Sequence, residues 1–572
     1  MTGPGSASGP DSVGGAGTAY GGVGVEGVAG DAGSLAAERP AVPWSATEWS
    51  RAGWRTHLGR TAAETGRLDA LIDELGAATI LDLAAESARR FPDRVAVTVD
   101  GEPVTHAGLA AGASQVADWL AARTEPGDRV LLAAGSSLGF LRCYLGALQA
   151  GTVVVLANPG YTAAELGHLV ADSGAVLALA DPGPAAQLAS LPSRGAAPLP
   201  IAPVSGVAAD GDWAGAGVRQ KRVVRPGDTA LLAYTSGTTG RPKGVPLTHR
   251  QLAVSIRAAQ AAWRWTARDV LVHALPLFHQ HGLGGVHATL VAGSTAHIRS
   301  RFRAADLIGT VRAAGGTVLF GVPASYQGLL DEAAGEPLLN RLRLAVCGSA
   351  PLSPELAARL PGLLGQLPLV RYGSTESGLD VSNPLGAARA DTVGLPLPGV
   401  QCRVWAPSGA AGPGADGEIQ LRGPQVFGGY WADPAATAAA FTADGWFRTG
   451  DIGVVEEATG HLLIRGRSKE LIISGGLNVY PREVELALES HPAVAEAAVA
   501  ALPHRRWGEQ VTAWVVPRPG RELSEPDLIA HARTRLAAYK CPKQVFLVAE
   551  LPRNPLGKLD RRALTASHPQ AR

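Results

Sequence analysis

Residues 234–244 read Tyr234-Thr-Ser-Gly-Thr-Thr-Gly-Arg-Pro-Lys243-Gly244 and combine three threonines, a serine, three glycines and a lysine. Glycines let backbone N–H groups approach a ligand closely, hydroxyl groups donate hydrogen bonds, and an ammonium group neutralises negative charge. This composition predicts a polyphosphate site. The stretch is not a Walker A loop, because no Lys-Ser or Lys-Thr pair follows its glycines, and the order of its residues argues against the alternative of an ordinary surface loop. The residues expected to contact phosphate are Thr235, Ser236, Gly237, Thr238, Thr239, Gly240 and Lys243.

The chain on either side of this stretch alternates between strand-like and helix-like patterns. The apolar run Ala230-Leu-Leu-Ala-Tyr234 predicts a strand that leads directly into the loop. Helical patterns at 81–90 and 107–123 alternate with apolar runs at 129–134, 152–156 and 176–180, and further apolar runs lie at 270–275, 317–320, 344–347 and 418–421. Alternation of this kind is typical of the α/β fold class with largely parallel strands.

The length of 572 residues predicts more than one domain. The first residues, to about Gly33, are mostly Gly, Ala, Ser and Val, with few side chains that could offset the entropy of ordering. Near Arg467 the pattern changes to a run of about one hundred residues with its own strand patterns. We therefore expect an N-terminal extension at 1–75, largely disordered at its start, a large domain at 76–467 and a small C-terminal domain at 468–572.

Charge and cysteine usage limit the classes of partner. The 51 Lys and Arg residues balance 50 Asp and Glu residues, which gives no electrostatic reason to expect nucleic acid or a membrane surface as a partner. The apolar stretch 130–159 is interrupted by Arg142, serines and glycines, so it predicts a buried strand–helix–strand unit rather than a membrane span. Four scattered cysteines without CxxC spacing, and a start that lacks a secretory pattern, favour a cytoplasmic protein.

Six more motifs follow the 234–244 stretch in order. They are Gly348-Ser-Ala-Pro351, Arg371-Tyr-Gly-Ser-Thr-Glu376, Trp446-Phe-Arg-Thr-Gly-Asp451, Arg465-Gly-Arg-Ser-Lys-Glu470, Ser474-Gly-Gly-Leu-Asn478 and Asn554-Pro-Leu-Gly-Lys558. Together they span about residue 81 to the C-terminus. In these motifs the chain resembles the adenylate-forming superfamily of acyl-CoA synthetases, firefly luciferase and peptide-synthetase adenylation domains. The resemblance implies an enzyme that joins a carboxylic acid to the α-phosphate of ATP, and a large domain of layered sheets and helices followed by a small, mobile α+β domain.

The resemblance also implies a role for each nucleotide-site residue. Tyr372 would lie against the adenine, beside the backbone of Gly348, Ser349, Ala350 and Pro351, and the neighbouring Arg371 and Gly373 belong to the same site. Glu376 would bind Mg²⁺, a hard cation that takes carboxylate and phosphate oxygens, and Thr375 would contact phosphate. Asp451 would accept hydrogen bonds from the ribose hydroxyls, with Arg467 as a nearby donor. Taken alone, Asp451 after Thr-Gly is equally well interpreted as a turn residue.

Lys558 would stabilise the charge that develops between the carboxylate and the α-phosphate. Its alternative interpretation is a solvated surface lysine. In the family, the small domain turns between two half-reactions, first bringing in the lysine and then the loop at 474–478. Lys469 falls at the hinge position of that movement.

The segment His273-Ala-Leu-Pro-Leu-Phe-His279-Gln-His281-Gly-Leu283 corresponds to the acid-pocket motif of the family. Its histidines suggest zinc as an alternative, but no matching cysteine or carboxylate set accompanies them. We therefore expect His279 to act in the acid pocket. This motif, with Trp263-Arg-Trp265, Phe320-Gly-Val-Pro323 and Arg371, is similar to malonyl-CoA synthetases and oxalate-activating enzymes, and Arg371 suits a second carboxylate. Arg299 and Arg301 are weaker candidates for the same role.

Departures from the malonate-type pattern keep the acid open. That pattern usually reads Glu-Arg-Tyr-Gly-Met-Thr-Glu-Thr, whereas this chain has Val370, Ser374 and Ser377 in place of the first Glu, the Met and the last Thr. The resemblance implies that Ser374 borders the acid pocket. The hydroxymethyl group of serine is smaller and more polar than the thioether of methionine, so the pocket would be larger and more polar. Malonate and a substituted malonate are both consistent with this change.

The acceptor of the acyl group is CoA by resemblance, which makes ATP, Mg²⁺ and CoA the expected cofactors and a small carboxylic acid the expected substrate. The alternatives are a carrier-protein thiol, an amine, or nitrite chemistry in a specialised biosynthetic pathway. A catalytically inactive nucleotide-binding protein is disfavoured, since Lys243, Glu376, Asp451 and Lys558 are all present.

Overall fold

The computed structural model describes residues 45–59, 74, 76–192, 198–207, 222–235, 242–333, 342–474, 477–505, 507–553 and 559–566. All of them belong to one unit, Val42–Arg572. The predicted disordered start of the chain lies outside the described residues, as do Ser236–Gly240 and Lys558.

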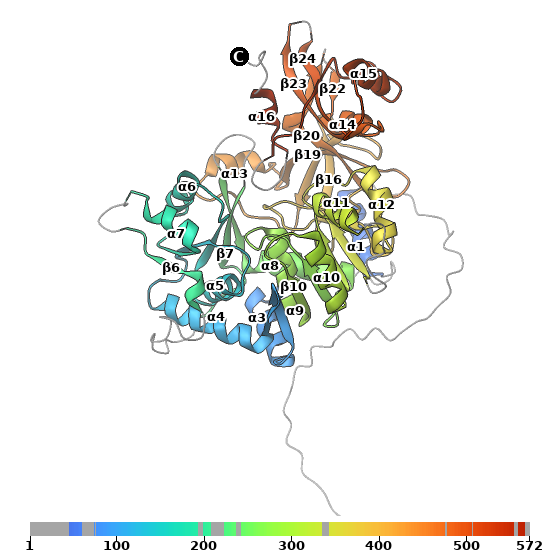
Figure 1. Cartoon of the computed structure of the whole chain (residues 1–572). Coiled ribbons are helices and arrows are strands. Elements are labelled where there is room, and N and C mark those ends of the chain that lie inside the picture. Colours follow the sequence, from blue (N-terminus) through green and yellow to red (C-terminus); the bar gives the residue numbers. More distant parts are fainter. Residues whose placement is uncertain are drawn as a thin grey trace, which may run out of the picture. The chain divides into compact units, whose positions relative to one another are not determined.

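A six-stranded sheet carries the start of the α/β pattern, in the strand order β6-β5-β3-β4-β7-β8. All neighbours pair in parallel except β7 and β8, which are antiparallel. The predicted buried unit at 130–159 is confirmed, because the chain runs from β3 through the buried helix α5 into β4, which pairs in parallel with β3. Helix α5 lies beside α4 (Figure 1). The strands are β3 (Arg129–Ala133), β4 (Val153–Ala157), β5 (Leu177–Ala180), β6 (Ile201–Pro203), β7 (Thr229–Thr235) and β8 (Lys243–Thr248). The helices of this part are α4 (His106–Ala121), α5 (Leu138–Gln149), α6 (Ala163–Ser173) and α7 (Pro182–Ala189), followed by the 3-10 turn η2 (Val204–Val207).

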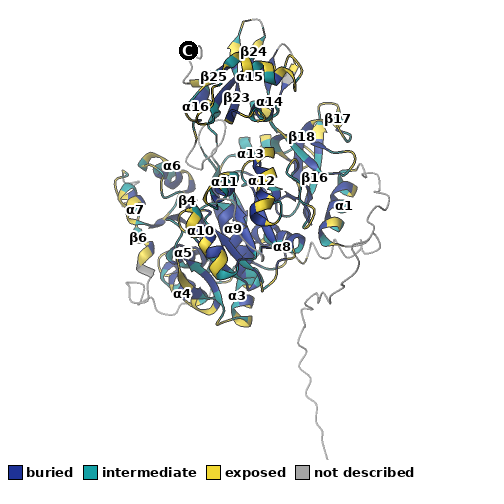
Figure 2. Ribbon diagram, turned by 45° about the vertical axis from the view of Figure 1, so that its right-hand side comes forward, coloured by how far each residue is buried: buried dark blue, intermediate teal, exposed yellow. Residues whose placement is uncertain are grey.

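A nine-stranded sheet has the order β15-β14-β13-β12-β11-β9-β10-β1-β2. Its six central strands are parallel, which confirms the largely parallel arrangement expected from the sequence. The strands are β1 (Val95–Val99), β2 (Glu102–Thr105), β9 (Val270–His273), β10 (Thr295–Ile298), β11 (Val318–Gly321), β12 (Leu344–Cys347), β13 (Leu369–Tyr372), β14 (Val381–Ser382) and β15 (Leu395–Pro396). The accompanying helices are α3 (Ile80–Arg90), α8 (His249–Trp263), α9 (Gln280–Ala292), α10 (Ala304–Ala314), α11 (Pro323–Glu332) and α12 (Pro354–Leu364). Of these, α9 is dark blue along most of its length because it is buried in the core (Figure 2).

Two smaller sheets complete the described chain. The first, in the order β17-β16-β18-β19-β20, is antiparallel, and the second has the order β22-β21-β24-β23 with β25 parallel to β24. The first contains β16 (Gln401–Ala406), β17 (Gly409–Ala410), β18 (Gly417–Arg422), β19 (Phe447–Val455) and β20 (Leu462–Arg467), with α13 (Pro434–Ala440) nearby in the chain. The second contains β21 (Ile472–Ser474), β22 (Leu477–Val479), β23 (Val494–His504), β24 (Gly508–Pro517) and β25 (Gln544–Leu547), with η3 (Ser468–Glu470), α14 (Pro481–Glu489), α15 (Glu525–Arg533) and α16 (Arg561–Ala566). It has its own hydrophobic core.

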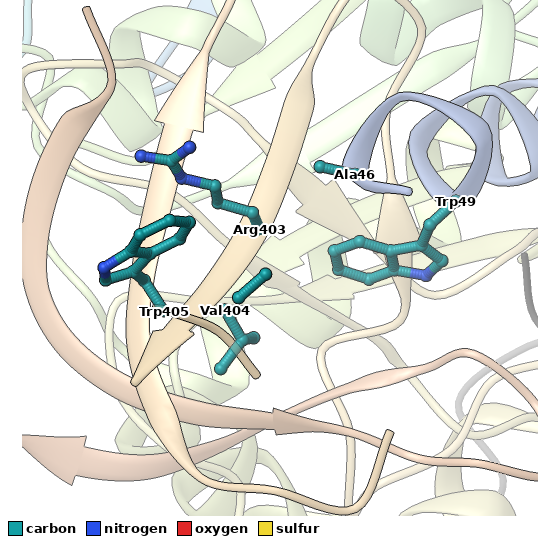
Figure 3. Close-up of a pocket in the computed structure, with 6 residues that line it drawn as sticks. Ala46, Trp49, Arg403, Val404 and Trp405 are labelled. Atoms are coloured by element: carbon teal, nitrogen blue, oxygen red, sulfur yellow. The ribbon is translucent and has the colours of Figure 1, made fainter. Parts of the chain in front are cut away.

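Helix α1 (Ala46–Leu58) lies within the range that the sequence analysis assigned to the extension, and the sequence did not predict it. Ser45 caps its first turn by accepting a hydrogen bond from the backbone N–H of Glu48. Two buried tryptophans fix the helix to distant loops, because Trp49 Nε1 donates to Gly460 O and Trp54 Nε1 donates to Val400 O, each at 2.8 Å. A cavity of about 120 Å³ lies beside this helix and is lined by none of the predicted site residues (Figure 3).

Replacing Trp54 by Phe is expected to lower the free energy of unfolding by about 1–3 kcal/mol, because the buried carbonyl of Val400 loses its indole donor. The midpoint of urea denaturation, followed by far-UV circular dichroism, measures the change. Trp405, which is 37% exposed, provides the matched control, and Trp405→Phe should shift that midpoint little. Equal shifts for the two variants would show that the Trp54 bond does not stabilise the fold.

None of the helices described for this chain is long and apolar enough to cross a lipid bilayer.

Candidate active site

Neighbouring parallel strands of the nine-stranded sheet end at one edge. There β9 ends at His273, β11 at Gly321, β12 at Cys347 and β13 at Tyr372. In open α/β sheets, ligands bind beyond the carboxyl ends of the strands. The sheet therefore gathers motifs that lie up to about one hundred residues apart in the sequence.

The phosphate-loop motif closes the β7–β8 hairpin. Thr235 pairs with Lys243 in the antiparallel register, so the end residues of the motif are held together as strand partners. Its central residues, Ser236, Gly237, Thr238, Thr239 and Gly240, lie outside the described residues. The Lys243 ammonium lies 4.9 Å from the centre of the Tyr430 ring, a cation–π contact.

Tyr430 connects the phosphate loop to the predicted metal ligand. Its hydroxyl donates to Glu376 Oε1 at 3.0 Å, while its ring faces Lys243. Burial raises the pKa of Tyr430, and the Glu376 carboxylate raises it further. Sequence reasoning missed Tyr430, and no local pattern identifies it, because it lies 54 residues from Glu376.

Glu376 fits the coordination that Mg²⁺ requires. Its side chain is half-buried, and only one of its two carboxylate oxygens has a hydrogen-bond partner among the described residues. One free carboxylate oxygen beside a phosphate loop suits Mg²⁺, which usually takes one or two carboxylates together with phosphate oxygens and water. The neighbouring Thr375 is held through its carbonyl, which accepts from Gln280 Nε2 at 3.1 Å.

Asp451 joins two other motifs. Tyr372 Oη donates to Asp451 Oδ2 at 2.7 Å, and Arg467 Nε lies 3.0 Å from Asp451 Oδ1. Asp451 and Arg467 are direct partners in the β19–β20 register, so the turn interpretation of Asp451 is wrong and the residue lies within a strand. Burial raises the pKa of Tyr372, and the Asp451 carboxylate raises it further. The same carboxylate raises the pKa of Arg467.

Arg371 lies across Gly348 at the edge of the sheet. A Cβ atom at Gly348 would come within 2.4 Å of Arg371 Nε, so glycine leaves the room that this side chain occupies. Burial lowers the pKa of Arg371 to about 10, which leaves the guanidinium charged at neutral pH. Within the described residues, Arg371 makes no side-chain hydrogen bond, and its charged neighbour is Asp380.

His281 lies beside Arg371 in a neutral form. Burial lowers its pKa well below the ordinary value, and the charge of Arg371 lowers it further. Its Nδ1 lies 3.2 Å from Ser349 Oγ, and its buried Nε2 has no hydrogen-bond partner among the described residues. His279 caps the start of α9, with its Nδ1 accepting from the backbone N–H of His281 at 3.4 Å.

His273 of this segment and His287, further along α9, are core residues. His273 is fully buried at the end of β9, and His287 contacts the Tyr144 hydroxyl at 3.0 Å inside the core. Burial lowers the pKa of His273 to about 4 and that of His287 to about 3. In the described part of the chain, no group of three or more His, Cys, Asp or Glu side chains is arranged to hold a metal ion.

The remaining predicted residues surround this edge or lie beyond it. Ser349 adopts a left-handed backbone conformation with φ of 68°, and Ala350 and Pro351 are exposed after β12. Gly373 allows a tight turn, since a Cβ there would lie 2.0 Å from Gly378 O. Lys469 is exposed in η3. Arg299 is the least suited of the acid-binding candidates, because its Nε donates to Thr310 Oγ1 at 2.7 Å.

Comparisons with known proteins identify the family of the chain. A model of the AMP-binding enzyme family matches residues 84–431, and a model of the AMP-binding enzyme C-terminal domain matches residues 483–558. The chain is 36% identical over 482 residues to the mitochondrial malonate–CoA ligase ACSF3 of Bos taurus, covering 76% of this chain and 81% of the relative. It is also 36% identical over 480 residues to a feruloyl-CoA synthase of an Amycolatopsis species, covering 82% and 95%. The ATP-bound crystal structure of MatB from Rhodopseudomonas palustris superposes with a TM-score of 0.77 at 35% identity, covering 85% of this chain and 98% of that one.

Proposed function

The chain belongs to the AMP-binding enzyme family, and on that premise we propose that it activates a small dicarboxylic acid with ATP and transfers the acyl group to CoA. The family match confirms the resemblance to adenylate-forming enzymes that the motifs indicated. The family match does not identify the acid, because relatives of similar identity are named for malonate and for ferulate. The dicarboxylic acid and CoA are therefore what we propose.

ATP would bind across the edge where the motifs meet. The β7–β8 loop and Lys243 would hold the phosphates, and Glu376 would hold the Mg²⁺ that neutralises them. Asp451 is held by Tyr372 and Arg467 in a geometry that leaves a carboxylate in place to accept from ribose hydroxyls. In this arrangement the α-phosphate would be open to attack by a carboxylate, and pyrophosphate would be the leaving group.

The observation that carries the acid class is the half-buried Arg371 guanidinium. It keeps its charge and has no hydrogen-bond acceptor among the described residues, so it is available to pair with an anionic group of a ligand. A carboxylate that binds there would form a charge-assisted, bidentate pair. The neutral His281 beside it offers a buried Nε2 without a partner. A dicarboxylate has one carboxylate for this pair and one for adenylation.

The proposed reaction has a direct test. ATP–pyrophosphate exchange is measured with a panel of mono- and dicarboxylates, and AMP release is then measured with CoA, amines, nitrite or a carrier protein as acceptor. Exchange that depends on a dicarboxylate and AMP release that depends on CoA support the proposal. Exchange with aryl or fatty monocarboxylates alone would contradict a dicarboxylic acid as the substrate. AMP release with an amine, nitrite or a carrier protein, and not with CoA, would show that CoA is not the acceptor.

Replacing Arg371 by Ala is expected to raise KM for the dicarboxylate by about 10²-fold while raising KM for ATP by less than about threefold, because a charged hydrogen-bonded pair with the acid is lost. Steady-state kinetics of pyrophosphate release measure both constants. His279→Ala is expected to change the constants in the same direction by less. Arg89→Ala, which removes an arginine whose side chain is 69% exposed and which is not a site candidate, serves as the control. Unchanged KM for the acid in Arg371→Ala would remove Arg371 from the acid site.

A further inference from the structure

A chain of hydrogen bonds runs from the half-buried Ser374 into the core. Ser374 Oγ lies 3.0 Å from Ser377 Oγ, and Ser377 Oγ donates to Asp380 Oδ2. Gln425 Nε2 donates to the other carboxylate oxygen, Asp380 Oδ1, at 3.2 Å. Ser377, Asp380 and Gln425 are buried, so Ser374 is the member of the chain that a ligand can reach.

The tight turn after β13 holds this chain in place. Gly378 N donates to Ser374 O at 2.8 Å, and Asp380 N donates to Tyr372 O at 3.0 Å. The close approach of the Gly378 carbonyl to Gly373 leaves no room for a side chain at that position. The relative positions of Ser374, Ser377 and Asp380 are therefore fixed by the backbone.

The direction of the hydrogen bonds follows from counting protons. An ionised Asp380 can only accept, so Ser377 gives its single hydroxyl proton to Asp380. Ser377 Oγ can then only accept from Ser374, which uses the single hydroxyl proton of Ser374. Ser374 Oγ then has lone pairs that can accept a hydrogen bond from a ligand, and it has no further proton to donate. Towards a ligand, Ser374 is then an acceptor only.

We propose that Ser374 recognises a hydrogen-bond donor carried by the dicarboxylate, and that Asp380 is a positioning residue that fixes this polarity through Ser377. The inference rests on the proposed function and deepens it. Arg371, three residues before Ser374, pairs with the second carboxylate, while Ser374 accepts from a hydroxyl or ammonium group on the carbon between the carboxylates. The substrate class is a donor-substituted malonate rather than malonate itself.

The polarity of Ser374 depends on the charge of Asp380. Burial raises the pKa of Asp380 to about 7, hydrogen bonds from Ser377 and Gln425 and the charge of Arg371 oppose that rise, and the charge of Glu376 adds to it. Tyr372 and Cys402 are the other titratable groups near this carboxylate. A protonated Asp380 can donate to Ser377, which can then donate to Ser374 and free the Ser374 proton for the ligand. Acceptor-only behaviour is therefore present above about pH 7 and lost as the pH falls through that value.

Three malonates of similar shape separate the possibilities. Aminomalonate carries an ammonium group that only donates, hydroxymalonate carries a hydroxyl that donates or accepts, and methylmalonate carries neither. In the full-length enzyme at a pH above that pKa, kcat/KM in the exchange assay is expected to be at least about tenfold higher for each of the first two than for methylmalonate. For aminomalonate this preference should fall as the pH falls through about 7, and for hydroxymalonate it should persist.

Two variants test the relay itself. In Asp380→Asn, the side-chain carbonyl keeps the bond from Gln425 and the amide donates to Ser377, so the chain reverses and Ser374 gains a proton to donate. The preference for aminomalonate should fall, because Ser374 has one lone pair fewer for the ammonium and can present its proton instead. The preference for hydroxymalonate should remain, and neither should depend on pH near 7. In Ser374→Ala, both preferences should be lost.

Several outcomes would overturn the inference. A wild-type enzyme that activates all three malonates equally leaves the proposed function standing and removes the role of Ser374. Asp380→Asn losing activity by the same factor on every acid would show that Asp380 is only structural. If other dicarboxylates support exchange and none of the three malonates does, the proposed function stands and the inference fails. If no dicarboxylate supports exchange, the proposed function fails and the inference fails with it.

Discussion

Replacing Asp451 by Ala lowers kcat/KM for ATP by about 10²-fold or more, the result expected if this carboxylate accepts two hydrogen bonds from the ribose. Hydrogen bonds to a charged group contribute about 1.5–3 kcal/mol each, and tenfold corresponds to about 1.4 kcal/mol. The variant also removes the partner that holds Tyr372 and Arg467 in place. The loss should therefore exceed that of removing either neighbour alone.

The measurement is pyrophosphate release as a function of ATP concentration at saturating acid. Asp444→Ala is the matched control, since Asp444 pairs with Arg403 at 2.8 Å in the same region of the chain and its side chain is 58% exposed. The control should retain its kcat/KM for ATP within about twofold. If Asp451→Ala had a normal KM for ATP and a raised KM for the acid, Asp451 would belong to the acid site and not to the ribose site.

Local sequence patterns predicted the sheets of the large part of the chain with few errors. The apolar runs at 129–134, 152–156 and 176–180 became β3, β4 and β5, and the helical pattern at 81–90 became α3. These elements are buried, and burial imposes a continuous apolar run or a helical period that one sequence displays. Parallel pairing followed from the alternation of the two patterns.

Helix α1 was missed because the Gly- and Ala-rich residues before it dominated the interpretation of the N-terminal range. Its buried residues Trp49, Gly53, Trp54 and His57 recur at helical spacing, and Ser45 with Glu48 gives a start signal. That pattern was present in the sequence. Its partners, the carbonyls of Gly460 and Val400, are more than 300 residues away and follow no local rule.

The site was predicted as a set of motifs and not as a set of contacts. Asp451 and Arg467 were both named, but the strand register that places them opposite each other is a property of the folded sheet. Tyr430 and Asp380 were not named at all. Each acts through burial and through partners on other segments, and a single sequence does not display either property.

Lys558→Ala is expected to slow adenylate formation by about 10²–10³-fold while leaving thioester formation from a presented adenylate within about threefold of the wild-type rate. Lys558 lies outside the described residues, so this prediction rests on the Asn554–Lys558 motif and on membership of the family. An ammonium that approaches the oxygens between carboxylate and α-phosphate stabilises the transition state of the first half-reaction only. The second half-reaction breaks the bond to AMP with a thiolate and does not need it.

The two half-reactions are measured separately, by single-turnover formation of pyrophosphate and by release of AMP when synthetic adenylate and CoA are supplied. Lys543→Ala is the matched control, because Lys543 Nζ donates to Ala538 O on the surface of the C-terminal region. We propose that residues 468–572 turn as a domain about Lys469, which separates the two steps in time. Equal losses in both half-reactions of Lys558→Ala would contradict that rotation, because a lysine that leaves the site after the first step cannot slow the second.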